Sequence, residues 1–202
     1  MDELLERLQA ELDDAEGWIR VVGADWWLDD LRLDVSVQYH DGREAELWEI
    51  TCTGVAEDLL TASGGASLTL STESPLIRLF SEPQVQIMFA RNALAAEALL
   101  GIVCSCCVDV MGKADFVTRF MNGAATIKGI AGSEYGLLGR FPQSLAIRIL
   151  ASLADKAIAA HALPGWTPTK WNGEEHVSYP RLQVLSIGAS YVIAEQFGAS
   201  RA

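Results

Sequence analysis

The chain has 202 residues, of which 50% are hydrophobic and 21% are charged, and its formal net charge is −12. A chain of this length supports one domain, or at most two small ones, with a core that needs neither disulfides nor metal. The composition excludes a disordered chain, a membrane protein and a disulfide-rich secreted mini-protein. The acidic balance also argues against a nucleic-acid-binding protein that relies on a basic footprint.

The negative charge is concentrated in the first third of the chain. Residues 1–60 contain 17 Asp or Glu and four Arg, a net of −13, whereas residues 61–202 contain ten acidic and eleven basic residues, a net of +1. Such an asymmetry predicts an acidic surface on one region of the protein. A solvated helix and hairpin that only keep the protein soluble would give the same count.

The N-terminus predicts an amphipathic helix over about 2–16, because leucines recur at helical spacing and Gly17 ends the pattern. It lacks the positive start and apolar stretch of a signal peptide. The longest uncharged helical stretch, Ala98–Val108, is too short to cross a bilayer. We therefore expect a cytoplasmic protein that does not bind membranes.

Strict alternation of apolar and polar residues from Leu31 to Tyr39 predicts a half-buried antiparallel strand, with Val35 in the core and Ser36 in solvent. Asp41-Gly42 predicts the following turn, and Ala45–Thr53 the partner strand. Further candidate strands are Trp18–Val22, Ser67–Ser71 and Val85–Ala90. Leu182–Ile187 and Tyr191–Phe197 predict one or two closing strands, or a strand and a short helix.

From about residue 91 the hydrophobic period becomes helical. A nearly unbroken apolar pattern predicts a buried central helix over about 92–111, with Asn92 as its N-cap and Gly112 as its end. A second long helix is predicted over about 142–162, and residues 164–180 predict a loop. The whole pattern predicts an α+β fold with a mainly antiparallel sheet. We expect a single domain over 1–202, β-rich and acidic to about residue 90 and helix-rich from about 91.

The motifs of common active sites are absent: there is no nucleophile elbow, phosphate-binding loop or dinucleotide-binding glycine pattern. Cys104 and Cys107 have the C-x-x-C spacing, but deep inside the predicted helix, which favours core packing. A metal site with Cys52 as an extra ligand and a redox pair remain alternatives. We predict no cofactor and no metal.

Tryptophans beside acidic residues are the strongest candidates for a binding surface, because aromatic side chains on loops are enriched at recognition sites. One group lies in the acidic connector and one in the proline-rich loop. A role as caps over the core edges is the alternative. The candidate binding residues are Asp25, Trp26, Trp27, Asp29, Asp30, Trp166 and Trp171.

The sequence thus favours a non-catalytic binding protein whose acidic N-terminal surface meets a basic protein partner. In general design it resembles the immunity proteins of bacteria, which are small, acidic and cytosolic. One alternative is an enzyme with a dispersed acid/base site, for which Glu49, Asp58 and His176 are candidates. Another is a structural homo-oligomer subunit, which the 50% hydrophobic content supports, and a homodimer is among the partners that stay open.

Overall fold

The computed structural model describes residues 1, 3–6, 17–28, 30–90, 94–121 and 134–202. The chain forms two compact units. Unit 1 consists of Met1–Ile77 and Tyr179–Ala202, and unit 2 consists of Arg78–Ser178. Unit 2 is therefore inserted in the sequence of unit 1. The single domain expected over 1–202 stays a prediction.

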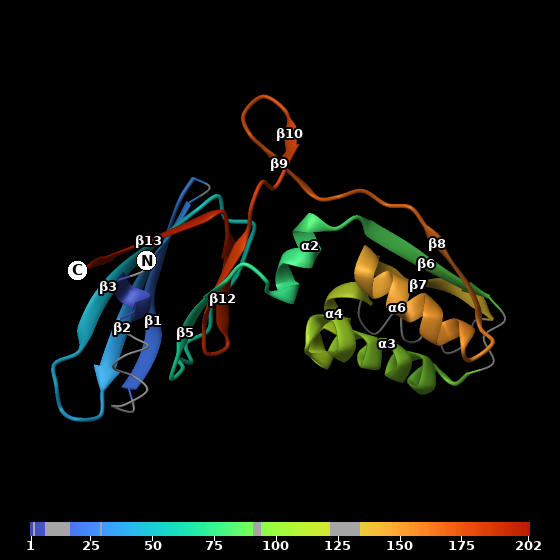
Figure 1. The fold of residues 1–202 in the computed structure, drawn as a ribbon, viewed down its shortest axis with the longest axis horizontal. Helices are drawn as coiled ribbons and strands as arrows, with labels where there is room; N and C mark the ends of the chain where they lie inside the picture. The colour runs from blue at the N-terminus through green and yellow to red at the C-terminus, as the bar shows by residue number, and fades with distance from the viewer. Residues whose placement is uncertain (2, 7–16, 29, 91–93, 122–133) are drawn as a thin grey trace. The chain divides into compact units, whose positions relative to one another are not determined.

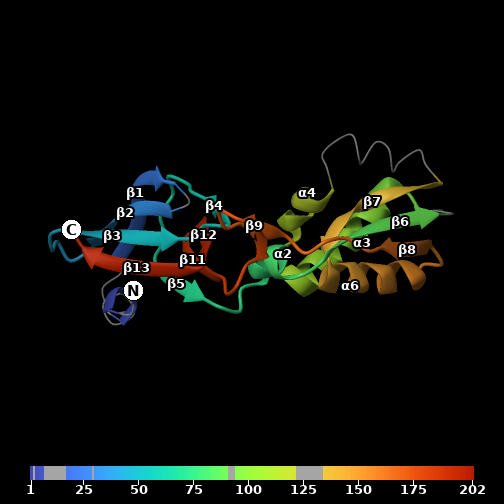
Figure 2. The same ribbon diagram turned by 90° about the horizontal axis from the view of Figure 1, so that it is seen from above.

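Unit 1 is built from two antiparallel sheets of four strands (Figure 1). The first sheet has the order β1-β2-β3-β13, which Figure 2 shows from β1 at one edge to β13 at the other. The second sheet has the order β4-β12-β11-β5. The strands are β1 (Gly17–Trp27), β2 (Asp30–Tyr39), β3 (Glu46–Thr53), β4 (Glu57–Leu59), β5 (Leu68–Ser71), β11 (Gln183–Ile187), β12 (Ser190–Ala194) and β13 (Gln196–Arg201).

The two sheets of unit 1 share one core. Leu33 and Ile50 of the first sheet belong to the same buried cluster as Leu68, Ile187 and Val192 of the second. Fully burying an aliphatic side chain of this size stabilises the fold by roughly 1.5–3 kcal/mol. Leu4 also joins this cluster from a short helical stretch over residues 3–6. The rest of the predicted helix over 2–16 lies mostly outside the described residues.

The predicted strand over Leu31–Tyr39 is confirmed, and its apolar side chains are buried as the alternation requires. The expectation that Ser36 faces solvent is wrong, because its relative exposure is only 4%. Arg20 and Leu47 lie directly opposite Ser36 on the two neighbouring strands. A small side chain between two longer ones on the same face keeps little exposed surface.

Unit 2 contains a three-stranded antiparallel sheet of order β7-β6-β8, with the helices α3 and α6 on one side of it (Figure 1). Both outer strands run antiparallel to β6. They are thus parallel to each other, and α6 connects them across the middle strand. The elements are β6 (Gln84–Ala90), α3 (Ala96–Met111), β7 (Tyr135–Pro142), α6 (Gln143–Ala154) and β8 (Ala159–Leu163).

The α+β class, the mainly antiparallel pairing and the buried central helix are confirmed, but both long helices are shorter than predicted. The described helix α3 begins at Ala96 and ends before Gly112, whose N–H donates to the carbonyl of Val108. The predicted N-cap Asn92 lies outside the described residues.

Helix α6 ends at Ala154 instead of continuing to residue 162. Ala157 adopts a left-handed conformation with φ +57°, and the N–H of Ile158 donates to the carbonyl of Leu153. This is a Schellman motif with alanine in the position usually held by glycine. The next residues form β8. Since no glycine stands between the helix and this strand, the sequence did not mark where the helix ends.

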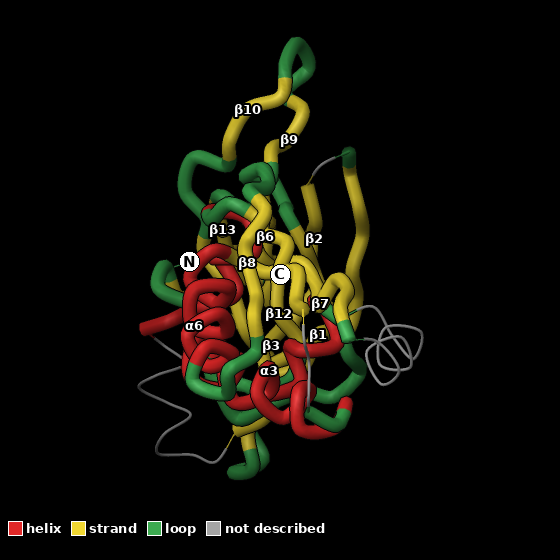
Figure 3. The backbone as a smooth tube through the Cα atoms, turned by 90° about the vertical axis from the view of Figure 1, so that its right-hand side faces the viewer, coloured by secondary structure: helices red, strands yellow, loops and turns green. Residues whose placement is uncertain are grey.

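The remaining elements are short. Residues 164–180, predicted as a loop, contain a hairpin of β9 (Thr169–Trp171) and β10 (His176–Ser178), which Figure 3 shows as a two-stranded ribbon separate from the three-stranded sheet. Asn172 accepts hydrogen bonds from the N–H groups of Glu174 and Glu175 and so fixes the hairpin turn. The other elements are η1 (Pro75–Ile77), α2 (Arg78–Ser81), η2 (Ala114–Phe116) and α4 (Val117–Phe120).

Candidate functional site

The turn between β1 and β2 presents three consecutive apolar side chains to solvent. Trp26 is 52% exposed, Trp27 is 79% exposed and Leu28 is 87% exposed. The strands pair up to Trp27 and Asp30, so only residues 28 and 29 connect them. We call Trp26, Trp27 and Leu28 the apolar turn.

Leu28 is unfavourable for folding in two ways. Its φ is +56°, a left-handed conformation that costs an L-residue other than glycine, asparagine or aspartate roughly 1–2 kcal/mol. Turns of two residues normally place Asn, Asp or Gly at such positions. Its side chain also gains nothing from burial. Strained residues that do not serve the fold are concentrated at functional positions.

The predicted acidic residues around this turn have different environments. Asp25 is exposed and lies opposite Arg32, which forms an ion pair of 2.5 Å with Glu49. Asp30 is half-buried, and its Oδ1 accepts a hydrogen bond of 3.1 Å from the N–H of Gly54. Asp30 therefore holds the turn after β3 in place. Asp29 lies outside the described residues.

The second predicted tryptophan group belongs to unit 2. Trp171 lies in β9, is 56% exposed and meets the ring of His176 edge-on at 5.3 Å. The exposed ring of Trp166 is covered on one face by the guanidinium of Arg140, 4.3 Å from its centroid. The two tryptophan groups expected to form a binding surface are thus carried by different units.

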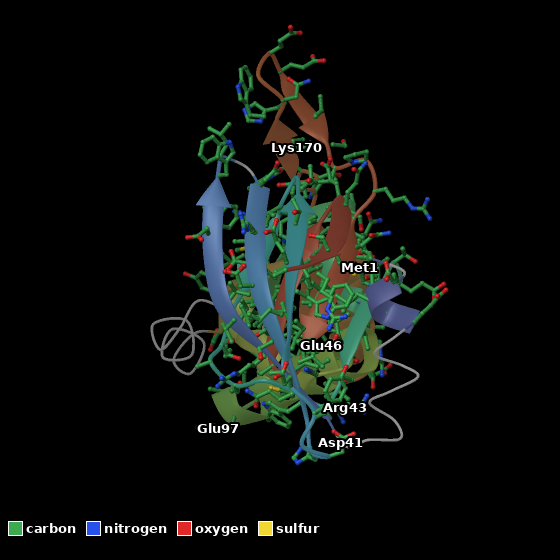
Figure 4. The ribbon with its side chains drawn as sticks, turned by 90° about the vertical axis from the view of Figure 1, so that its left-hand side faces the viewer. Met1, Asp41, Arg43, Glu46, Glu97 and Lys170 are labelled. Carbon is green, nitrogen blue, oxygen red and sulfur yellow. The ribbon has the colours of Figure 1, made fainter. Side chains whose placement is uncertain are left out.

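The net charge is carried by the same unit as the apolar turn. Unit 1 contains 19 Asp or Glu and 6 Lys or Arg, a formal net charge of −13, and unit 2 contains 8 acidic and 9 basic residues, a net of +1. Some of these acids are neutralised locally. At the β2–β3 turn, Arg43 donates its backbone N–H and its Nε to Asp41, which lowers the pKa of the Asp41 carboxyl (Figure 4).

A groove of about 520 Å³ lies between α3 and α6, and three of its lining residues, Cys106, Arg148 and Ser152, belong to one hydrogen-bond network. Arg148 donates from Nε and Nη2 to Asp109 at 3.0 and 2.8 Å, which raises the pKa of Arg148. Its Nη1 donates to Ser152 at 3.1 Å, and the thiol of Cys106 is 3.5 Å from the same hydroxyl. This network ties the two helices together.

The cysteines have the surroundings of core residues. Burial raises the pKa of the Cys107 thiol to about 12 and that of Cys52 to about 12, so neither is a thiolate near neutral pH. The predicted core packing thus holds for Cys107, whereas Cys104 is only half-buried. Cys106 is buried on the side of α3 that α6 covers, where its thiol lies 3.5 Å from the Ser152 hydroxyl. In the part of the chain that the structure describes, no three His, Cys, Asp or Glu side chains form a group that could hold a metal ion.

The candidates for acid/base chemistry have structural partners or lie apart in the fold. Glu49 is paired with Arg32 on the neighbouring strand. Asp58 lies in β4 of unit 1, whereas His176 lies in β10 of unit 2, where its ring is close to Trp171.

No helix among the described residues is both long and apolar enough to cross a membrane.

Leu28 was not among the binding candidates predicted from the sequence. The available signal was its position in a two-residue turn between Trp27 and Asp30, where a leucine is uncommon.

Comparisons with models of protein families, with curated proteins and with solved structures give no match for this chain.

Proposed function

We propose that the protein is a non-catalytic binding protein that holds a basic protein partner through the apolar turn of its acidic unit. The observation that carries the proposal is Leu28, which is 87% exposed and has φ +56° beside two exposed tryptophans. Each property opposes folding or solubility, and together they suit a surface that is buried on binding.

The chemistry of the surroundings indicates what kind of partner fits. Tryptophan is one of the side chains enriched among the residues that dominate binding energy. The charge of −13 on unit 1 attracts a positively charged partner and accelerates encounter. The expected partner surface is an apolar pocket with Lys and Arg at its rim. A basic toxin, such as those that bacterial immunity proteins neutralise, is one partner of this class.

The test uses the full chain as bait in a lysate of its native host, followed by binding kinetics with the recovered partner. We expect a basic partner whose dissociation from the W26A/W27A variant is at least about tenfold faster, because aromatic anchors act mainly on the off-rate. The wild-type association rate should fall as salt rises from about 50 to about 500 mM, since exposed charges are then screened.

Trp171→Ala is the matched control, because Trp171 is exposed to the same extent as Trp26 but belongs to unit 2. Its effect on dissociation should be less than about twofold. Equal loss in the control, or no loss in W26A/W27A, would overturn the proposal and move the interface away from the apolar turn.

A further inference from the structure

The outer side of β1 is open beside the apolar turn. β1 is the edge strand of the first sheet and pairs with β2 on its inner side (Figure 2). On its outer side, Ile19 exchanges backbone hydrogen bonds of 2.8 and 2.7 Å with Gly65. Within the described residues, no other backbone group pairs with this side of β1. We call the outer side of Val22–Trp27 the free edge.

The register with β2 shows which backbone groups of the free edge point outward. Val37 of β2 lies opposite the residue of β1 that bonds outward, so Val37 itself faces β3. Leu33 and Leu31 face β3 as well, because the direction alternates along a strand. Ala24 and Trp26 lie opposite these two leucines. The N–H and carbonyl groups of Ala24 and Trp26 therefore point away from the sheet.

The two tryptophans stand on opposite faces of the free edge. Residues directly opposite each other on paired strands share a face of the sheet. Trp26 lies opposite the buried Leu31 on the core side, and Trp27 lies opposite Asp30 on the other side. A partner that packs on one face reaches only one of the two rings. A strand added beside β1 has side chains on both faces and contacts both rings.

The two faces of the free edge also differ in charge. The core side carries Ala24 and Trp26. On the other side Asp25 is exposed, and the carboxylate of Asp34 lies over Gly23, where a Cβ would be 2.7 Å from Asp34 Oδ2. A strand that matches both faces has apolar residues alternating with Lys or Arg. The same carboxylates disfavour the edge of a second acidic copy, because charged edges oppose pairing with themselves.

We propose that the basic partner binds by adding an extended strand of alternating apolar and basic residues to the free edge. This inference rests on the proposed function for the partner's charge and for the apolar turn as the contact. In such strand addition, the unpaired backbone groups supply affinity and the alternate side chains supply specificity. Gly65 already occupies the edge at Ile19, so the added strand is confined to the part of β1 that ends in the apolar turn.

The first test titrates the full chain with a capped peptide of about eight residues in which valine alternates with lysine. We expect binding in calorimetry at about 50 mM NaCl. An isomer with its valines and lysines in separate blocks should bind at least about tenfold more weakly, because its side chains no longer match the two faces. Two further peptides carry N-methyl groups on the backbone amides of either the valines or the lysines. Only one of them should lose binding, since alternate amides face opposite sides of a strand.

The second test removes one outward N–H from the protein. Ala24→Pro should weaken peptide binding at least about tenfold, while the fold persists because proline is tolerated where the N–H of an edge strand faces solvent. Ala24→Val keeps the N–H and should change binding less than about twofold. Ala199→Pro is the matched control: Ala199 also follows a glycine, in β13 at the opposite edge of the sheet. The N–H of Ala202 bonds to β3, so by alternation that of Ala199 points outward. Far-UV circular dichroism confirms that each variant is folded.

Strand addition and the proposed function fail separately. An alternating peptide that does not bind would overturn strand addition, and so would equal binding of the two methylated peptides or equal effects of Ala24→Pro and Ala199→Pro. A natural partner that needs the two tryptophans but is indifferent to Ala24→Pro would also overturn strand addition and leave the proposed function standing. A natural partner indifferent to W26A/W27A would instead overturn the proposed function.

Discussion

The two units expose apolar side chains in different settings. Unit 1 is strongly acidic and exposes them at a strained turn, whereas unit 2 is nearly neutral and exposes them on the flat face of a sheet. A charged surface steers an oppositely charged partner, and a nearly neutral surface has no such long-range effect. The two units therefore differ in the electrostatic environment of their exposed apolar side chains.

The largest effect should follow from a charge in the core of one unit. Val35 is fully buried in unit 1, so Val35→Asp should destabilise that unit by more than about 4 kcal/mol. The long helices belong to unit 2, so the helical signal in circular dichroism should persist after unit 1 unfolds. Loss of both signals in a single transition would mean that the units unfold as one domain.

A medium effect is expected at Glu46, a buried carboxylate of unit 1. Its Oε2 accepts a hydrogen bond of 3.1 Å from the indole N–H of the buried Trp48, and Arg201 lies 3.4 Å from its Oε1. Glu46→Ala should cost about 1–3 kcal/mol, because it leaves the indole N–H unpaired in the core. Glu44→Ala, at an exposed position just before β3, is the control and should be nearly neutral in chemical denaturation.

A more gradual loss of stability is expected at alkaline pH, and it should affect both units. The folded state holds the pKa of Cys52 in unit 1 and Cys107 in unit 2 at about 12, against an ordinary value of 9.0. Above pH 9 the unfolded chain releases these protons first, so stability should fall between pH 9 and about 12. Alanine at either position should flatten this pH dependence in denaturant titrations of the affected unit. An unchanged profile would show that burial does not control these thiols.

The smallest change in stability should come from the apolar turn, and with the opposite sign. Leu28→Asn should stabilise the protein by up to about 1 kcal/mol, because asparagine tolerates a left-handed conformation better than leucine. The same variant should weaken binding of the basic partner. Destabilisation, or unchanged binding, would remove the argument that Leu28 is kept for recognition.

The order of apolar, polar and turn residues predicted the elements whose structure depends on neighbours in the sequence. The alternation over Leu31–Tyr39 and the Asp41-Gly42 turn placed the β2–β3 hairpin correctly, because side-chain period and turn residues act within a few positions. The end of α6 at Ala154 was not predictable in this way, since the left-handed residue after it is Ala157, and alanine seldom adopts that conformation.

Long-range features could not be predicted from the sequence pattern. The pairing of β5 with β11 and of β3 with β13 joins segments more than a hundred residues apart in the chain. The exposure of Trp26 and Trp27 agrees with their choice as binding candidates, and their role in binding stays a prediction. The hydrogen bond from Gly54 to Asp30 required the tertiary structure, since it joins a strand to a distant turn.

The insertion of unit 2 between β5 and β11 has a consequence for biosynthesis. The strands that pair with β3, β4 and β5 are β13, β12 and β11, which leave the ribosome only after the whole of unit 2. At roughly 5–20 residues per second, synthesis of unit 2 takes on the order of 5–20 s. During that interval β3, β4 and β5 lack these partner strands, and unpaired strand edges are prone to aggregation until β11, β12 and β13 emerge.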